Sequence, residues 1–499
     1  MSITLSEQDE STLRTAAWGA VSLMSAAGAA GSAHKVATEG AIALTSATGL
    51  VGHVLATAPK GMKYGKSVAE LADQVLPALA ASMSLLNQRD PAEAGNFRHT
   101  VLVAVEASTR PQHGTPGPTL TEMARKITEA LDAAAPGPDR PELQKIIQEL
   151  VDSGIVGVTL RVRDERGEWV GSAGAGELGG IEAPPADGHV RIGSNTKTFT
   201  ATVVLRLVAE GKIGLDTPVD DYLPEFGLDR RITVRMLLQH TSGVFNFTGE
   251  YFEDGTFVPG IPATPAGKEW VDNRFHTYPP RELVRLALSK PARFEPGTGW
   301  SYSNTNYVLA RLLIEQVTGR PVAEEMRRLI LGPLGLTGTV QPTTEQDLPA
   351  PYAHAYYRYE EDGRTRTVDV TRHNPSWLSS GGDMISTTRD LQTFITALVG
   401  GKLLPAELLA EMCTPESKAG YGLGVFVQPT PDGGTVITHN GGMAGHAALM
   451  YSTPDGRRTL TAALNYVDDA AMSAAAAFQQ ATQRLVAEVF GGGQAGPAQ

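Results

Sequence analysis

Residues 1–108 carry the pattern of an all-helical segment. Ser67, followed three residues later by Glu70, forms a capping box that opens one predicted helix. Asp90 and Pro91 give another helix start, an N-cap followed by proline at the first helical position. Runs of β-branched and aromatic residues bounded by turns are scarce here, so no sheet is expected. We therefore predict an N-terminal helical module.

A turn-rich segment follows this module. Residues 109–118 are rich in proline and glycine, as is typical of a linker. A capping box at Thr119–Glu122 opens a helix that is expected to end near Ala135, and Pro-Gly-Pro at 136–138 is a second break. The sequence thus predicts a linker with one helix over residues 109–139.

From residue 140 onward the order is strands, then many helices, then strands. This order predicts an α+β domain over residues 140–490 whose sheet pairs both ends of the segment. A flexible tail is expected at 491–499. The expected elements are a helix over 143–150, a hairpin of 156–162 with 169–173, a mostly helical stretch over 194–340, strands over 425–427, 435–439, 447–451 and 460–465, and a helix over 470–489.

The composition argues against several classes of binding partner and structural feature. The 499 residues include 42 Lys+Arg and 54 Asp+Glu, a net charge of −12. Non-specific binding to nucleic acid or anionic lipid needs a basic surface, so neither partner is expected. No run of about 18 apolar residues predicts a membrane span. The single cysteine, Cys413, excludes an internal disulfide, and no His-Glu-x-x-His sequence occurs, so we expect neither a metal nor another cofactor.

The N-terminal run Ala16–Ala30 is small and apolar, as in the core of a signal peptide. A secretory signal also needs a positively charged start, whereas this run follows an acidic stretch at 6–10 with Arg14 as its one cation. We interpret the run as an Ala-rich helix of a folded domain. A cytoplasmic protein is therefore expected, with secretion as the alternative.

Candidate chemistry begins at Ser194 and Lys197. Residues three apart on a helix share a face, so both side chains are expected at the N-terminus of the helix that starts here. Free N–H groups at a helix N-terminus favour a developing oxyanion. A serine becomes a nucleophile when a neighbouring base takes its proton, which is the logic of the Ser-x-x-Lys motif. The motif alone is weak, because Ser32 and Lys35 form a second copy.

Two further segments strengthen the hypothesis. Tyr302 and Asn304 lie in a Tyr-Ser-Asn sequence; a phenol beside an ammonium group is expected to have a lowered pKa and to act as a general base, and the amide can hold the lysine. His439 ends a predicted strand and is followed by Asn440 and two glycines. Gly442 there is expected to supply a second oxyanion N–H group. Each segment alone has an ordinary structural explanation, in a packed loop or at a strand end.

Together, these segments resemble the serine β-lactamase and penicillin-recognising family, in its class C-like branch. Within that family the chain is most similar to D-alanyl-D-alanine carboxypeptidases and related esterases. The resemblance covers about residues 140–490. The matching stretches are 192–199, 232–243, 294–297 leading to 302–306, 380–387 and 439–442.

The resemblance implies an antiparallel sheet flanked by helices, an all-helical lobe, and a nucleophile between them. It implies Ser194 as the nucleophile, and Lys197 and Tyr302 as the base system, without deciding which of the two is the general base. It also implies substrate contacts from Asn304 and His439. The oxyanion hole would be the N–H groups of Ser194 and Gly442.

Other positions are ambiguous or depart from the family. Trp377 and Phe245 match residues that line the family's cleft, but both could equally be core aromatics. The carboxypeptidases grip a terminal carboxylate with an arginine on the strand that here spans 425–428, which holds no cation. Asn440 and Gly442 replace the hydroxyl-bearing residues of the family. A buried carboxylate without such partners is unfavourable, so esters, amides or modified peptides fit better than free D-Ala-D-Ala termini.

The sequence therefore predicts a serine hydrolase that forms an acyl-enzyme with a small-molecule or peptide substrate. The alternative is a catalytically silent sensor or scaffold with the same fold. For the N-terminal helical module, packing on the catalytic domain, formation of oligomers and binding of a partner all stay open.

Overall fold

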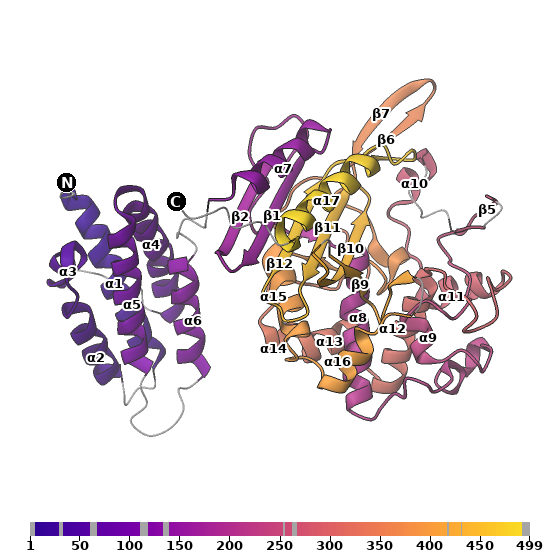
Figure 1. Cartoon of the computed structure of the whole chain (residues 1–499), viewed down its shortest axis with the longest axis horizontal. Coiled ribbons are helices and arrows are strands. Elements are labelled where there is room, and N and C mark those ends of the chain that lie inside the picture. The colour runs from indigo at the N-terminus through magenta and orange to yellow at the C-terminus, as the bar shows by residue number, and fades with distance from the viewer. Residues whose placement is uncertain are drawn as a thin grey trace. The chain divides into compact units, whose positions relative to one another are not determined.

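The computed structural model describes residues 5–28, 33–59, 67–109, 118–132, 139–252, 255–261, 267–416, 419–430 and 432–491. The chain forms two compact units, Met1–Gly137 and Pro138–Gln499 (Figure 1). The predicted tail lies outside the described residues from 492 onward, as does Ser32 of the second Ser-x-x-Lys copy. Within the described ranges, no helix has the length and apolar character needed to cross a bilayer.

The N-terminal unit is a bundle of helices. Its members are α1 (Glu7–Ala27), α2 (Ala33–Thr45), α3 (Gly49–Leu55), α4 (Val68–Arg89), α5 (Pro91–Thr109) and α6 (Pro118–Asp132). The predicted starts of α4 and α5 are present: the Ser67 side chain accepts from Glu70 N–H, and Asp90 Oδ1 accepts from Glu93 N–H at 3.3 Å. Residues 16–27 of the Ala-rich run lie in α1, which packs against α4.

The helix predicted within the 109–139 linker is α6, and it belongs to the bundle. This helix packs against α1, α4 and α5, and Met123, Ile127 and Leu131 on one of its faces join the apolar core of the bundle. The boundary between the two units falls between Gly137 and Pro138. Proline and glycine beside a helix mark its ends, but whether that helix packs depends on its apolar face.

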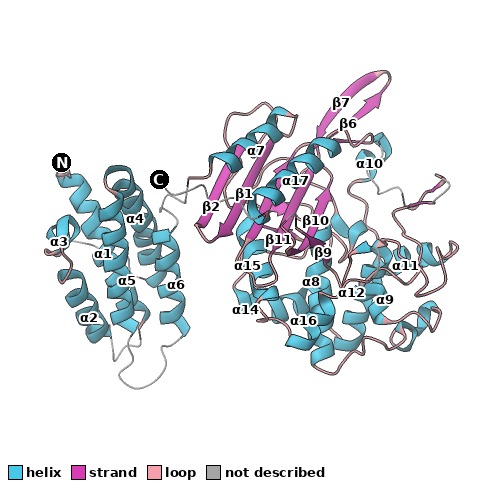
Figure 2. Ribbon diagram, viewed as in Figure 1, coloured by secondary structure: helices cyan, strands magenta, loops and turns pink. Residues whose placement is uncertain are grey.

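The second unit is built on a six-stranded antiparallel sheet in the order β2-β1-β12-β11-β10-β9 (Figure 2). Strands from both ends of the domain pair, for example Val158 with Leu464, as the sequence predicts. The strands are β1 (Gly157–Asp164), β2 (Gly167–Gly174), β9 (Phe426–Pro429), β10 (Thr435–Met443), β11 (His446–Ser452) and β12 (Thr459–Asn465).

Helices cover both faces of this sheet. On one face, α7 (Pro141–Asp152) and α17 (Ala475–Phe490) bury their apolar sides against β1, β11 and β12 (Figure 2). On the other, α8 (Thr196–Ala209) and α15 (Thr388–Val399) form a larger core with the helical lobe. The α+β prediction is confirmed. The lobe also holds α9 (Val234–Leu238), α11 (Pro280–Leu288), α12 (Asn304–Thr318), α13 (Val322–Met326), α14 (Gly332–Leu334) and α16 (Ala406–Met412). A further helix, α10 (Gly267–Asn273), packs against β6 (Tyr356–Glu361) in a separate apolar cluster.

Short strands complete the unit. Pairs form between β3 (Val190–Arg191) and β8 (Ile385–Ser386), and between β4 (Glu250–Tyr251) and β5 (Phe257–Val258). A three-stranded sheet joins β13 (Val467–Asp469) to the hairpin of β6 (Tyr356–Glu361) and β7 (Arg364–Asp369). The sequence analysis missed this hairpin, which projects from the body of the domain in Figure 1.

Candidate active site

Ser194 lies in a single 3-10 turn, Gly193–Asn195, that leads directly into α8. The turn packs closely on β10: a Cβ atom placed on Gly441 would lie 2.5 Å from Ser194 N, and one on Gly193 would lie 2.5 Å from Gly442 N. Asn195 fastens the turn from the other side, because its Nδ2 donates to Ile192 O at 2.9 Å and to Ala448 O at 3.0 Å. The backbone N–H groups of 194 and 442 are thereby held near each other.

Lys197 occupies the first turn of α8 and is fully buried. Its Nζ donates to Asn304 Oδ1 at 2.7 Å and to Gly381 O at 2.6 Å, and lies 3.1 Å from Ser194 Oγ. Burial lowers the pKa of this amine to about 7. A neutral amine has two N–H bonds and one lone pair. With both N–H bonds directed to fixed oxygens, the lone pair is left for the Ser194 hydroxyl.

Tyr302 approaches the same serine from the end of the loop before α12. Desolvation by the packed surroundings raises the pKa of its phenol, and an interaction with the Ser194 side chain acts in the opposite direction. Lys197 Nζ lies 4.7 Å from the centre of the Tyr302 ring, over its face. The sequence analysis expected a lowered pKa for this phenol, whereas the shift is upward, because burial disfavours the phenolate.

Asn304 begins α12 and links the lysine to the helical lobe. Its backbone N–H donates to Asn246 Oδ1 at 3.1 Å, and its Nδ2 lies 3.4 Å from Thr248 Oγ1. Its Oδ1 is left to accept from Lys197. The structure thus brings together the four residues that the sequence singled out first, 194, 197, 302 and 304.

His439 lies on β10 beside this group and is neutral. Its Nδ1 is 2.9 Å from Asn440 O, a carbonyl that can only accept, so Nδ1 carries the proton. Its Nε2 therefore accepts from the Tyr421 hydroxyl at 3.1 Å. Burial, together with the nearby Lys197, lowers the pKa of His439 to about 3. The imidazole ring centre lies 6.5 Å from that of Tyr302.

The remaining residues predicted to contact substrate differ in their exposure to solvent. Gly442 is exposed next to Ser194, whereas the Asn440 amide turns into the sheet and donates to Tyr451 Oη at 2.7 Å. Trp377 is only 8% exposed and packs in an apolar cluster with Leu378 and Met443. Phe245 is 2% exposed. Both rings are largely buried, and Phe245 also borders a recess of the helical lobe.

The sequence analysis did not predict the aromatic residues that surround Tyr302. His240, at the end of the 232–243 stretch, has a positive φ of 64° and is fully buried. Its Nδ1 accepts from Ser303 N–H at 3.2 Å, and its ring centre lies 4.4 Å from that of Tyr302 and 4.9 Å from that of Tyr421. The Gln-His-Thr-Ser-Gly sequence was the available signal, but nothing in it points to a residue about 60 positions away.

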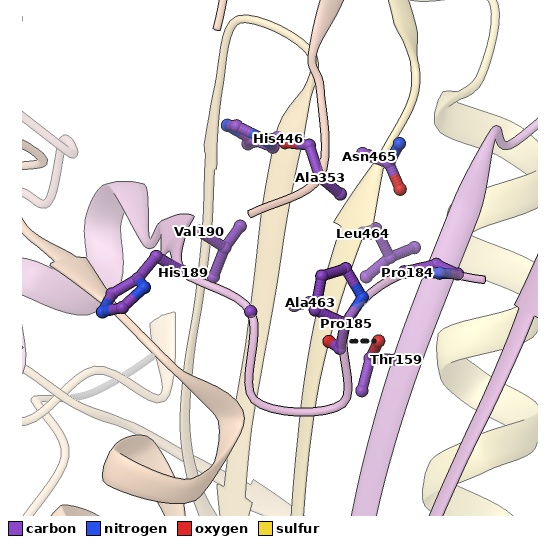
Figure 3. Close-up of a pocket in the computed structure, with 11 residues that line it drawn as sticks. Thr159, Pro184, Pro185, His189, Val190, Ala353, His446, Ala463, Leu464 and Asn465 are labelled. Carbon is purple, nitrogen blue, oxygen red and sulfur yellow. Dashed lines mark hydrogen bonds between the residues drawn. The ribbon is translucent and has the colours of Figure 1, made fainter. Parts of the chain in front are cut away.

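Two recesses of the domain lie apart from this cluster. The first holds about 20 Å³ and lies between the 184–190 segment and β12; Figure 3 shows Thr159, His446 and Asn465 around it. That volume suits a single water molecule. The second holds about 270 Å³ and is lined by residues 227–232, 242–245 and 287–296 of the helical lobe. Among the described residues, no group of His, Cys, Asp and Glu side chains is arranged to hold a metal ion.

Comparison with known proteins agrees with this geometry. The family model described as Beta-lactamase matches residues 143–483. An esterase of Burkholderia gladioli, EstB, is 37% identical over 153 residues, 29% of this chain and 36% of that protein. A penicillin-binding protein of Bacillus subtilis is 27% identical over 293 residues, 56% of this chain and 61% of that protein. The chain therefore matches less than two thirds of the length of these curated relatives.

Solved structures match over a larger share of their own length. A D-stereospecific amidohydrolase from Streptomyces has 39% sequence identity and a TM-score of 0.59, over 66% of this chain and 94% of that one. A D-amino acid amidase from Ochrobactrum anthropi, in complex with D-phenylalanine, has 25% identity and a TM-score of 0.59, over 70% and 99%. With the family model matching most of the chain, these similarities establish that the protein belongs to the beta-lactamase family of serine hydrolases.

Proposed function

We propose that the chain hydrolyses amides or esters through an acyl-enzyme on Ser194, with Lys197 as the general base. The observation that carries this proposal is the position of Lys197 Nζ, 3.1 Å from Ser194 Oγ, with a pKa lowered to about 7. About half of such amines are unprotonated at pH 7, and the unprotonated amine can accept the hydroxyl proton.

In the proposed acylation step, Lys197 takes the Ser194 proton while Oγ bonds to the substrate carbonyl carbon. The carbonyl oxygen becomes an oxyanion and accepts from the N–H groups of Ser194 and Gly442. Tyr302, whose phenol stays protonated, donates its proton to the departing amine or alcohol as the carbonyl–leaving-group bond breaks, and is reprotonated from Lys197. Water then attacks the ester carbonyl of the acyl-enzyme by the same route and frees the acid.

The substrate class follows from the charges that the site offers. The segment that includes β9 reads Val-Phe-Val-Gln at 425–428 and carries no cation, and His439 is neutral. A free terminal carboxylate would be desolvated there without a counter-charge, which is unfavourable. Amides and esters lack that charge. Because the Streptomyces relative is D-stereospecific, we propose D-amino-acid amides, D-peptides blocked at the carboxyl end and their esters as substrates.

Covalent labelling tests the proposal against a silent sensor or scaffold. The full chain is treated with a fluorophosphonate, and its intact mass is measured. We expect one adduct that disappears in Ser194→Ala and persists in Ser32→Ala, which alters the serine of the other Ser-x-x-Lys copy. Hydrolysis of D- and L-phenylalanine amide, followed in parallel, tests the stereochemical preference. No adduct with the wild-type chain would favour the non-catalytic alternative.

A further inference from the structure

A tight loop between the short helix at Pro375–Leu378 and β8 provides one of the oxygens that hold Lys197. Ser380 in this loop has a φ of 57°, a left-handed conformation that is uncommon for a residue with a side chain. Directly after it, Gly381 O accepts from Lys197 Nζ at 2.6 Å. Ser380 O accepts from Thr200 Oγ1 at 2.9 Å, so the loop also contacts α8 one turn further along. The position of the Gly381 carbonyl therefore depends on the conformation of Ser380.

Asp383 holds this conformation from inside the loop. The side chain is buried, and its Oδ2 accepts from Ser380 N–H at 2.9 Å. Two neighbours hold the loop from outside: Arg311 Nη1 donates to Ser379 Oγ at 2.9 Å, and Gln341 Nε2 donates to Ser380 Oγ at 3.0 Å. Burying a carboxyl group is costly, and burial raises the pKa of Asp383. An apolar residue at position 383 would avoid that cost. The presence of a carboxyl group there indicates that its oxygen functions as a hydrogen-bond acceptor.

We propose that Asp383 is a positioning residue for the general base: by accepting from Ser380 N–H it fixes the turn that presents the Gly381 carbonyl to Lys197. This inference rests on the proposed function, because it assigns Asp383 to the geometry of the Ser194–Lys197 pair. Without the acceptor, the left-handed conformation of Ser380 has less support, and the carbonyl moves away from Nζ. The amine then loses one of its two fixed N–H partners, and its lone pair is no longer directed at Ser194.

The pH profile of acylation reports on Lys197 directly. Gly381 O favours the protonated amine, and Asp383 acts on it in the same direction, so loss of either lowers the pKa of Lys197. The other titratable groups that face Lys197 keep one charge state near neutral pH. His240 and His439 have lowered pKa values, and the phenols of Tyr302 and Tyr307 have raised ones.

The test compares Asp383→Asn with Asp383→Leu. Asparagine keeps an oxygen that can accept from Ser380 N–H, whereas leucine fills a similar volume and accepts nothing. We expect kcat of Asp383→Leu on an ester substrate to fall by about tenfold or more with KM nearly unchanged, as for a displaced base. In this variant, the rate of reaction with the fluorophosphonate should fall off at a lower pH than in wild type, because the pKa of Lys197 is lower. Asp383→Asn should restore most of kcat.

A second pair of variants separates this role from a general loss of folding. Glycine adopts a positive φ without strain, so Ser380→Gly makes the turn less dependent on Asp383. We expect Ser380→Gly to recover part of the kcat lost in Asp383→Leu when the two are combined, while thermal unfolding confirms that each variant is folded. Unchanged kcat in Asp383→Leu, or equal losses in the Asn and Leu variants, would overturn the role of Asp383 alone. Failure of wild type to acylate would overturn the proposed function as well.

Discussion

The Lys197 amine lies over the face of the Tyr302 ring, 4.7 Å from its centre. This arrangement bears on which of the two residues is the general base, a question that the sequence did not decide. A lysine beside the hydroxyl would stabilise a phenolate and make the tyrosine a base. Desolvation raises the pKa of the buried Tyr302 phenol and keeps it protonated, while burial lowers the pKa of Lys197 to about 7 and suits the amine to act as the base. Tyr302 is then suited to donate a proton to the leaving group.

The first prediction concerns the pH dependence of acylation. The pKa of Lys197 in the folded protein is about 7, so the amine is protonated below that pH and cannot accept the Ser194 proton. We expect kcat/KM to fall about tenfold for each pH unit below 7, with a single ionisation. His439, with a pKa near 3, does not titrate in this range. A stopped-flow or plate assay with a p-nitrophenyl ester from pH 5 to 9 measures the profile, and an acid limb centred near pH 10 would contradict the assignment.

The second prediction concerns stability. Lys197 has a pKa near 7 when folded and about 10.5 when unfolded, so between these values the unfolded chain binds the additional proton. Stability therefore rises with pH in this window, by about 1.4 kcal/mol per unit for this group, and is flat below pH 7. Lys197→Met lacks this dependence. We expect the Tm of the variant minus that of wild type to decrease as pH rises from 7 to 10, as measured by calorimetry; a constant difference would show that the lysine is not desolvated.

The third prediction concerns Tyr302. Its phenol interacts with the Ser194 side chain, and the phenylalanine variant removes only the phenol oxygen. Proton transfer to the leaving group matters mainly in the transition state, so Tyr302→Phe should lower kcat on amides by about 100-fold or more with little change in KM. Activated esters, whose leaving groups need no proton, should be much less affected. Steady-state kinetics on a matched amide and p-nitrophenyl ester makes the comparison, and equal losses on both would rule out the donor role.

The sequence predicted those parts of the molecule that have local patterns. The order of strands, helices and strands predicted a sheet that pairs both ends of the domain, as β1 and β12 do, and three short motifs predicted Ser194 with Lys197, Tyr302 and His439 as site residues. It could not predict the partners of Lys197 that come from the backbone, because a carbonyl such as Gly381 O has no residue-type signature. Tertiary packing was not predictable either: Trp377 matched a cleft position but lies in an apolar cluster, and α6 was expected as a helix within a linker, because the segments beside it are rich in proline and glycine.

The last prediction concerns the contact between β10 and the Ser194 turn. A methyl group on Gly441 would lie 2.0 Å from Ile192 O and 2.5 Å from Ser194 N, both backbone atoms that cannot move without displacing the nucleophile. On Gly442, the nearest atom would be His446 O at 3.5 Å, an ordinary contact. We therefore expect Gly441→Ala to lower the Tm and to abolish fluorophosphonate labelling, whereas Gly442→Ala should unfold at the wild-type temperature. Gly176→Ala, whose methyl would meet no atom closer than 3.7 Å, serves as the labelling control. Normal labelling of Gly441→Ala would show that the turn and β10 do not pack as closely as the structure indicates, and the proposed pairing of the two N–H groups in an oxyanion hole would fail with it.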